Sequence, residues 1–159
     1  MTSIVKGSEN AFLRENETAT QKAAVQLHAE TVRPPEGFDV AFAAMAKARV
    51  GAVIVQSSLL AQTARAEQIA ELALRHRLGS ASAGAFADSG GLLSYGPSFS
   101  AQVQRAAAYV DKILKGAQPR ELPVEQPTTF DFVINLRTAK ALGITISPSI
   151  LLRADRVIK

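Results

Sequence analysis

The sequence predicts an α/β protein, a three-layer sandwich with a mostly parallel sheet. Segments in which apolar residues recur every three or four positions alternate with short apolar runs, as helices and strands do in such folds. One of these runs, Ala52-Val53-Ile54-Val55, is apolar at every position. Such a run is typical of a strand that is covered on both faces of a parallel sheet, so we expect it to be a central strand.

The first half of the chain alternates between helices and strands. We expect helices over residues 10–25, 38–48 and 60–78, and strands over residues 27–32, 52–55 and 80–85. Ser57 or Ser58 is expected to cap the third helix, and Gly79 to end it. Residues 1–11 are expected to be a poorly ordered start.

The most clearly marked element is a helix over residues 98–115. Its apolar residues recur at steps of three and four, which places them on one face: Phe99, Val103, Ala106, Ala107, Val110, Ile113 and Leu114. Ser98 or Ser100 is expected to cap this helix, and Gly116 to end it. We expect the apolar face to be buried, so that a charged residue at Val110 would unfold the domain.

Residues 117–159 are expected to form a connector and a C-terminal segment. Pro119, Pro123 and Pro127 favour an extended connector. A strand over residues 130–135, a helix over residues 136–142 and a terminal helix over residues 150–158 are expected to follow. The whole chain, 1–159, is expected to be a single α/β domain whose last part, 117–159, can pack on a partner.

The composition is that of one soluble globular domain. The chain has 159 residues, of which 47% are hydrophobic and 20% are charged. No apolar run approaches the roughly 20 residues that a membrane span needs. Because cysteine is absent, disulfides, thiolate metal ligands and a thiol nucleophile are excluded. Residues 1–11 lack the apolar core of a secretory signal.

Neither nucleic-acid binding nor catalysis is favoured. The net charge of +4 comes from scattered residues, and the cluster Arg75-His76-Arg77 falls at an expected helix C-terminus, where cations complement the helix dipole. The stretch 79–84 does not have the spacing of a nucleophile elbow, and the sequence implies no carboxylate partner for His28 or His76. Two histidines without cysteine do not favour a zinc site either, so no cofactor is expected.

Four motifs resemble the C-terminal part of substrate-binding proteins of ABC transporters, in the group associated with tryptophan, tyrosine or uncharacterised substrates. The motifs occupy residues 90–97, 107–117, 122–128 and 132–143, in the order found in that family. The resemblance extends less sharply back to about Phe12. Members of this group have two α/β lobes of the type I periplasmic binding protein fold, which close on a small ligand, and an export signal. The resemblance implies that this chain corresponds to the second lobe only.

The resemblance also implies a function. The chain would be a solute-binding component of an ABC transport system, or its C-terminal lobe, and would bind a small organic ligand such as an amino acid or an aromatic compound without catalysis. Its partner would be an ABC permease, and its location would be periplasmic, or cytoplasmic if Met1 is the native start. Two alternatives remain open, namely a single-lobe oligomeric module without a ligand and, less favoured, a small hydrolase.

The resemblance places ligand contacts at the carboxyl ends of the strands, where open α/β sheets bind ligands. The residues expected there are Gln56, Ser57, Ser58, Phe86, Asp88, Ser94 and Tyr95. Phe86 is the preferred candidate, because an aromatic residue in a loop of small residues has little local core to enter. Ser57 and Ser58 can instead be helix caps. Tyr95 can instead pack on the following helix, and Asp88 can start a turn.

A homodimer is expected. By resemblance, residues 117–142 belong to the region that crosses between lobes, so part of their apolar surface lacks its usual cover. The residues at risk of exposure are Phe130, Phe132, Val133 and Ile134. A second copy related by a two-fold axis is the simplest cover.

Overall fold

Seven strands form one sheet in the order β2-β1-β3-β4-β5-β6-β7 in a computed structural model, which describes the chain except residues 1, 7–9, 33–36 and 61–62. The strands are β1 (Thr2–Lys6), β2 (Leu27–Thr31), β3 (Ala52–Val55), β4 (Gly79–Ser82), β5 (Leu93–Pro97), β6 (Phe130–Asn135) and β7 (Arg156–Ile158). Neighbouring strands are parallel except β5 and β6, which are antiparallel. The predicted mostly parallel sheet, with β3 in its interior, is confirmed.

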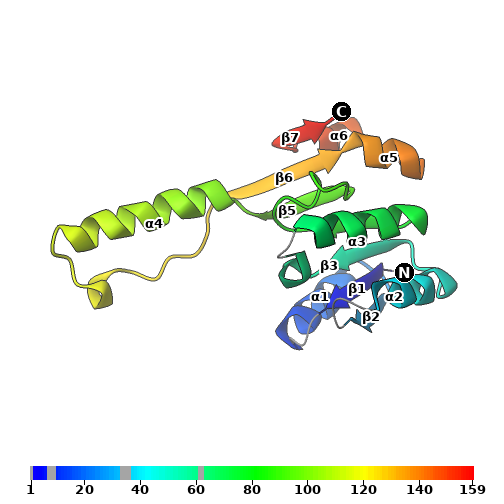
Figure 1. Ribbon diagram of the computed structural model, residues 1–159, viewed down its shortest axis with the longest axis horizontal. Helices are drawn as coiled ribbons and strands as arrows, with labels where there is room; N and C mark the ends of the chain where they lie inside the picture. The colour runs from blue at the N-terminus through cyan, green and yellow to red at the C-terminus, as the bar shows by residue number, and fades with distance from the viewer. Residues whose placement is uncertain (1, 7–9, 33–36, 61–62) are drawn as a thin grey trace.

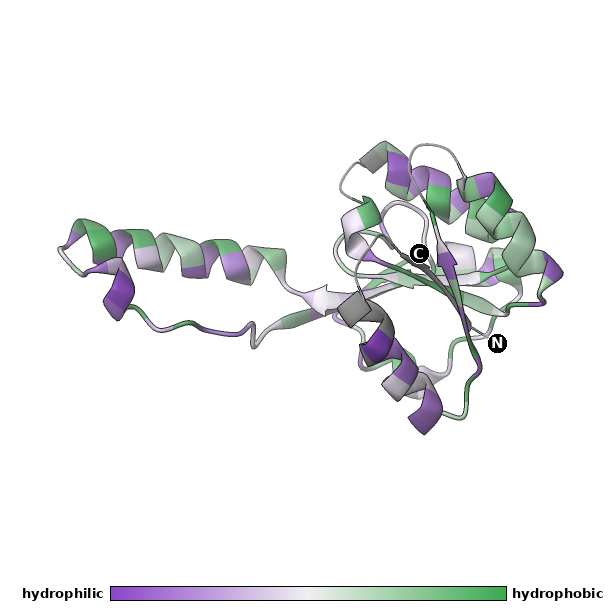
Figure 2. Ribbon diagram, turned by 90° about the horizontal axis from the view of Figure 1, so that it is seen from below, coloured by the Kyte–Doolittle hydropathy of each residue, from purple (hydrophilic) through white to green (hydrophobic). Residues whose placement is uncertain are grey.

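Helices on both sides of the sheet complete the three layers (Figure 2). The helices are α1 (Asn10–Lys22), α2 (Phe38–Lys47), η1 (Ser57–Leu60), α3 (Thr63–Arg75), α4 (Phe99–Leu114), η2 (Pro119–Glu121), α5 (Leu136–Leu142) and α6 (Pro148–Leu151). In the first half, each strand is followed by a helix and then by a parallel strand. Right-handed crossovers of this kind place α1 on one face of the sheet, and α2 and α3 on the other.

The core lies between the sheet and the helices α2 and α3. Its largest fully buried side chains include Phe38, Phe42 and Met45 from α2, Val53 and Val55 from β3, Ile69 from α3, and Phe86. The alternating burial of β3 agrees with a strand in the interior of the sheet. Each fully buried side chain of this size contributes about 1.5–3 kcal/mol, so this cluster dominates the stability of the fold.

The two ends of the chain differ from the prediction. Residues 2–6 form β1, which pairs with both β2 and β3, in place of a poorly ordered start. The terminal helix expected over residues 150–158 is wrong, because residues 156–158 form β7 and pair with β6. The backbone N–H of Asp155 donates to the carbonyl of Phe132 (2.9 Å), and the backbone N–H of Phe132 donates to Oδ2 of Asp155 (2.7 Å). These bonds to a distant strand override the local helical pattern.

The expected capping of α3 is also wrong. Ser57 and Ser58 lie in the short helix η1, whereas α3 begins only at Thr63. The amide of Leu59 donates to the carbonyl of Gln56, which closes the first turn of η1. The two serines therefore lie where β3 leaves the sheet, and they do not cap the long helix.

The largest difference concerns α4, which projects away from the body of the protein (Figure 1). No residue of α4 is buried, and Val103, Val110 and Ile113 are 51%, 55% and 40% exposed. The expectation that this face is buried, and that Val110→Asp would unfold the domain, is therefore wrong. The amphipathic pattern and the left-handed Gly116 (φ 101°) are as predicted. The surface that would cover the helix is not among the described residues.

After α4 the chain returns to the body through η2 and the extended residues 122–129 (Figure 1). We call residues 98–129 the arm, and residues 122–129 the return segment. Ser98 begins α4 without the predicted side-chain bond to the amides of the first turn. In β6, Val133 and Ile134 are buried, which contradicts their expected exposure, whereas Phe130 is 43% exposed.

Candidate functional site

The carboxyl ends of β3, β4 and β5 meet at one edge of the sheet, where α/β folds of this type bind their ligands. The hydroxyl of Ser82 donates to the carbonyl of Val55 (2.7 Å), so the loops that follow β3 and β4 lie side by side. The loop after β4 and the adjoining ends of β5, β6 and β7 enclose a hollow of about 350 Å³, which we call the edge hollow. Its charged residues are Asp88, Asp131, Asp155 and Arg156.

One ion pair dominates the edge hollow. Nη2 of Arg156 lies 2.6 Å from Oδ2 of Asp88. The hydrogen bond from Arg156 lowers the pKa of Asp88, and the hydrogen bond to Asp88 raises the pKa of Arg156. With three carboxylates and one guanidinium, the wall has a negative balance. It therefore favours a ligand group with a positive charge, and Arg156 can still hold a carboxylate.

Asp88→Asn is expected to reduce the loss of stability at acid pH. Because the pKa of Asp88 in the folded state lies below its ordinary value of about 3.9, the ion pair contributes fully above that value. The contribution is lost as the pH falls through the folded pKa. Both side chains are about half exposed, so the effect is small and falls with added salt.

The measurement is urea unfolding of the wild type and of Asp88→Asn at pH 6 and pH 3, at low and high salt. A matched control is Glu71→Gln, which removes the exposed ion pair with Arg75 on α3, away from the edge hollow. If the wild type and Asp88→Asn lose the same free energy of unfolding between the two pH values, the assigned role of the ion pair is wrong.

Four of the residues predicted from the sequence lie at the carboxyl edge. Gln56 is buried at the end of β3, and Ser57 and Ser58 are exposed immediately after it. Asp88 lines the edge hollow on the neighbouring loop. These residues share one edge of the sheet.

Phe86 is a core residue. Its side chain is 1% exposed and belongs to the cluster of α2, β3 and α3. The argument that it has little core to enter is wrong, because the loop after β4 folds back over the body. A Cβ atom at Gly91 would lie 2.3 Å from the ring of Phe86, so this glycine leaves the space that the ring occupies.

Ser94 has a structural role. It is 1% exposed, and its hydroxyl accepts a hydrogen bond from the amide of Ala87 (2.7 Å). This bond fixes the loop after β4 against β5. Neither Ser94 nor Phe86 presents its side chain to the edge hollow.

Tyr95 lies on the face of the sheet opposite the edge hollow. It is 60% exposed and stacks on Phe130, with ring centroids 5.7 Å apart, while Phe132 meets it edge-on at 5.9 Å. Gly96 and Asp131, the next residues along the two strands, line the edge hollow. Because side chains alternate along a strand, the three aromatic rings and the edge hollow lie on opposite faces. The expected packing of Tyr95 on the following helix is replaced by this stacking.

Two contributors to the site could not be expected from sequence reasoning. Arg156 was assigned to a terminal helix, and its partner Asp88 is 68 residues away in sequence. Asn135 is buried, and its side-chain amide donates to the carbonyl of Ala87 (3.0 Å). The Oδ1 atom of Asn135 accepts from the amides of Arg137 and Thr138, which caps α5. An asparagine before a helix is a capping signal, but its link to the loop after β4 has no local signature.

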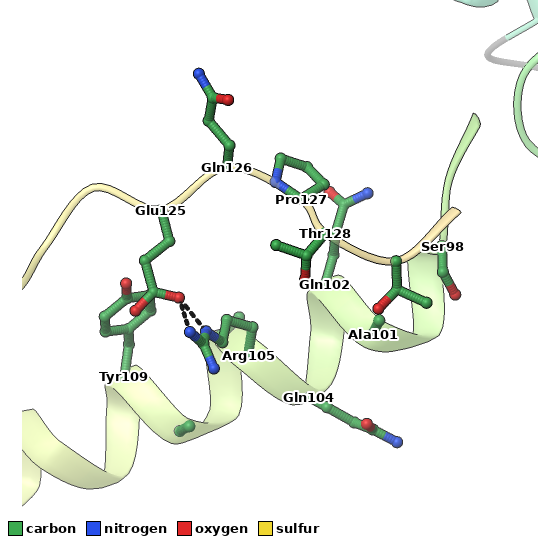
Figure 3. A pocket seen from close by; sticks show the side chains of 13 residues that line it. Ser98, Ala101, Gln102, Gln104, Arg105, Tyr109, Glu125, Gln126, Pro127 and Thr128 are labelled. Carbon is green, nitrogen blue, oxygen red and sulfur yellow. Dashed lines mark hydrogen bonds and ion pairs between the residues drawn. The ribbon is translucent and has the colours of Figure 1, made fainter. Parts of the chain in front are cut away.

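A larger hollow, of about 780 Å³, lies between α4 and the return segment (Figure 3). Arg105 forms an ion pair with Glu125, and the hydroxyl of Tyr109 donates to the carbonyl of Pro123 (2.7 Å). Gln104 points away from the return segment (Figure 3). Only one helix and one extended segment bound this hollow, so it lacks the converging strand ends of the edge hollow. We regard it as the space between the two sides of the arm and not as a ligand site.

The residues that the structure describes hold neither a membrane-spanning helix nor a cluster of metal ligands. None of their helices combines the length and apolar character that a membrane crossing needs. Within the same residues, no three His, Asp or Glu side chains come close enough together to hold a metal ion.

Comparison with known proteins gives one family and several similar structures. Residues 4–158 match the family model described as ABC transporter substrate binding protein. A conserved domain protein from Vibrio cholerae O1 biovar El Tor superimposes with a TM-score of 0.83 at 22% identity, over 98% of this chain and 54% of that one. The ABC domain from Streptococcus pneumoniae, solved in complex with L-Trp, gives a TM-score of 0.82 at 22% identity, over 99% of this chain and 56% of that one.

A third structure extends the comparison. A substrate binding protein with adhesive properties from Clostridium difficile, in a ligand-free, open form, gives a TM-score of 0.71 at 14% identity, over 99% of this chain and 54% of that one. No curated protein matches. The chain thus spans about half the length of the solved structures that it resembles, and at these identities the likeness shows the fold.

Proposed function

The chain belongs to the ABC transporter substrate binding protein family, and on this premise we propose that residues 1–159 form one ligand-binding lobe of an ABC-type transport system. The lobe binds a small organic ligand and releases it unchanged. The observation that carries this proposal is the edge hollow, which lies where α/β folds bind ligands and which pairs Asp88 with Arg156.

The proposed ligand class is amino acids. An amino acid presents an ammonium and a carboxylate a few ångströms apart, and the edge hollow offers carboxylates and a guanidinium at similar spacing. In this proposal Arg156 holds the ligand carboxylate, and Asp88 and Asp131 attract the ammonium. Ser57 and Ser58, on the adjoining loop, supply neutral hydrogen-bonding groups. The L-Trp of the streptococcal structure belongs to the same class.

The lobe alone is expected to bind weakly. A ligand site normally buries most of the ligand surface, whereas the residues that line the edge hollow all belong to this one lobe and provide one wall. In a titration of ¹⁵N-labelled protein with L-Trp, we expect a dissociation constant in the range of about 0.1–10 mM, well above micromolar. The shifted amides are expected to be those of residues 56–58, 84–88, 96 and 155–156.

Asp88→Asn is the test variant for this titration, and Glu71→Gln is again the matched control. We expect the dissociation constant for L-Trp to rise severalfold in Asp88→Asn and to be unchanged in Glu71→Gln. Submicromolar binding by the monomeric chain would contradict the one-wall argument. Shifts confined to residues outside the carboxyl edge would contradict the site.

The partner proposed for the loaded lobe is an ABC permease, and the proposed location is the periplasm, where proteins of this family work. The alternative is an interaction module without a ligand, which the exposed helix α4 favours. A panel of amino acids and aromatic acids that shifts neither amide signals nor the melting temperature would favour this alternative.

A further inference from the structure

Asp155 lines the edge hollow but has no part in the contacts proposed for a ligand. Its Oδ2 atom accepts a hydrogen bond from the backbone N–H of Phe132 (2.7 Å). Its own backbone N–H donates to the carbonyl of Phe132 (2.9 Å). Both bonds join the start of β7 to β6, so one oxygen of this carboxylate serves the backbone of the sheet.

The side chain of Asp155 takes the place of a further residue of β7. Successive residues of β6 direct their backbone groups alternately to β5 and to β7. The amide of Asn135 faces β5, where it donates to the carbonyl of Leu92, so the amide of Phe132, three residues earlier, faces β7. Strand β7 begins only at Arg156. The carboxylate of Asp155 supplies the acceptor for this amide and extends the pairing of the two strands by one residue.

The position of Arg156 depends on this extension. Strand β7 has three residues, of which Arg156 is the first, and lies at one end of the sheet beside β6 (Figure 1). Nη2 of Arg156 reaches Asp88, but both side chains are about half exposed, and such an ion pair does little to hold a strand in place. The far end of β7 has its own bond, from Nε of Arg137 to the carbonyl of Lys159. The near end is held by Asp155.

Two other carboxylates act on Arg156 directly. The hydrogen bond to Asp88 raises the pKa of Arg156, and the charges of Asp88 and Asp131 raise it further. The carboxylate of Asp155 is engaged by the amide of Phe132 instead. Its effect on Arg156 therefore passes through the backbone pairing of β6 and β7.

We propose that Asp155 is a positioning residue of the edge hollow. By extending the pairing of β7 with β6, it holds Arg156 where the guanidinium meets Asp88 and a ligand carboxylate. The contact with a ligand rests on the proposed function, whereas the placement of Arg156 beside Asp88 does not. Asp155 itself does not touch the ligand in this proposal.

The first test needs no ligand and compares two variants of Asp155 by NMR. Asp155→Ala removes the acceptor, whereas Asp155→Asn keeps an acceptor oxygen and removes only the charge. In Asp155→Ala we expect the amide hydrogen of Phe132 to exchange at least about tenfold faster. We also expect the pKa of Asp88 to rise toward its ordinary value, because Arg156 is no longer held beside it. In Asp155→Asn both quantities should stay close to those of the wild type.

Two further variants serve as controls. Asp111→Ala makes the same change as Asp155→Ala at a carboxylate that pairs with Lys115 on α4, away from the edge hollow, and should alter neither quantity. Arg156→Gln removes the guanidinium but leaves the bonds between Asp155 and β6 in place. It should raise the pKa of Asp88 while the amide of Phe132 stays protected.

The second test is a double-mutant cycle on the binding of L-Trp. Arg156→Gln is expected to raise the dissociation constant at least about threefold, since it removes the proposed carboxylate partner. Asp155→Ala should raise it by at most the same factor. The double variant should bind no more weakly than Arg156→Gln alone, because Asp155 acts only through Arg156. A double variant that binds more weakly would show that Asp155 acts on the ligand itself, and would overturn the positioning role.

Two results of the first test would also overturn the proposal. One is an Asp155→Ala protein in which the exchange of the Phe132 amide and the pKa of Asp88 keep their wild-type values. The other is an Asp155→Asn protein that matches Asp155→Ala in both quantities. If no variant and not the wild type binds L-Trp, while Phe132 and Asp88 respond as expected, the placement of Arg156 by Asp155 is supported and only the proposed function fails.

Discussion

Phe86→Ala is expected to lower the free energy of unfolding by about 3–5 kcal/mol, the largest effect of any substitution discussed. The ring is 1% exposed and packs in the core cluster, where its removal leaves a cavity. The loop after β4 also loses the contact that holds it over the body. Urea unfolding followed by circular dichroism measures the effect.

Phe99→Ala is the matched control, because it makes the same chemical change at a side chain that is 76% exposed. We expect its free energy of unfolding to stay within about 0.5 kcal/mol of the wild type at concentrations where the chain is monomeric. Gly91→Ala, whose new Cβ would collide with the ring of Phe86, is expected to destabilise the fold as well. Equal effects of Phe86→Ala and Phe99→Ala would show that Phe86 is not a core residue.

Asn135→Ala is expected to cost about 2–4 kcal/mol of unfolding free energy. The substitution removes the cap of α5, which is worth about 1 kcal/mol. It also leaves the carbonyl of Ala87 without its buried donor, which costs a further 1–3 kcal/mol. Asn135 thereby joins β6 and α5 to the loop after β4, which lines the edge hollow. We therefore expect the melting temperature of this loop to fall together with that of the body of the protein.

Two variants separate the parts of this effect. Asn135→Ser keeps a capping oxygen but is too short to reach Ala87, so it should lose less than Asn135→Ala. Ser147→Ala changes a helix-start residue whose side chain makes no cap bond, and should stay within about 0.5 kcal/mol of the wild type. Ser147→Ala and Asn135→Ala with the same unfolding midpoint would contradict the assigned role of Asn135.

An element could be predicted from the sequence where its apolar pattern and the residues that mark its ends lie close together along the chain. The strands β3 and β6 and the helix α5 have the predicted bounds, because each is framed by a glycine, a polar run or a capping residue close by. The pattern of α4 was equally clear, but periodicity reports only that one face is apolar. It does not report which surface covers that face.

The same limit applies to the site. Asp88 could be predicted because the edge of an α/β sheet is a general binding place and the residue follows β4. Arg156 could not, because the pairing of β7 with β6 brings it there, and that pairing depends on backbone bonds to a strand more than 20 residues away. Phe86 was misassigned because its loop folds over the core through long-range contacts such as the bond of Ala87 with Asn135, 48 residues away.

The antiparallel pairing of β5 with β6 makes the arm replaceable. Pro97 and Phe130 are register partners, and the amide of Ser98 donates to the carbonyl of Thr129 (3.0 Å). In topological terms the whole arm is therefore the loop of a β-hairpin. A two-residue Asn-Gly turn can replace the arm. It would lower the entropic free-energy cost of closing the loop by roughly 2 kcal/mol. The junction at residues 98 and 129 is thus a splice point, where an insert can be removed, exchanged or lengthened while every strand of the sheet keeps its neighbours.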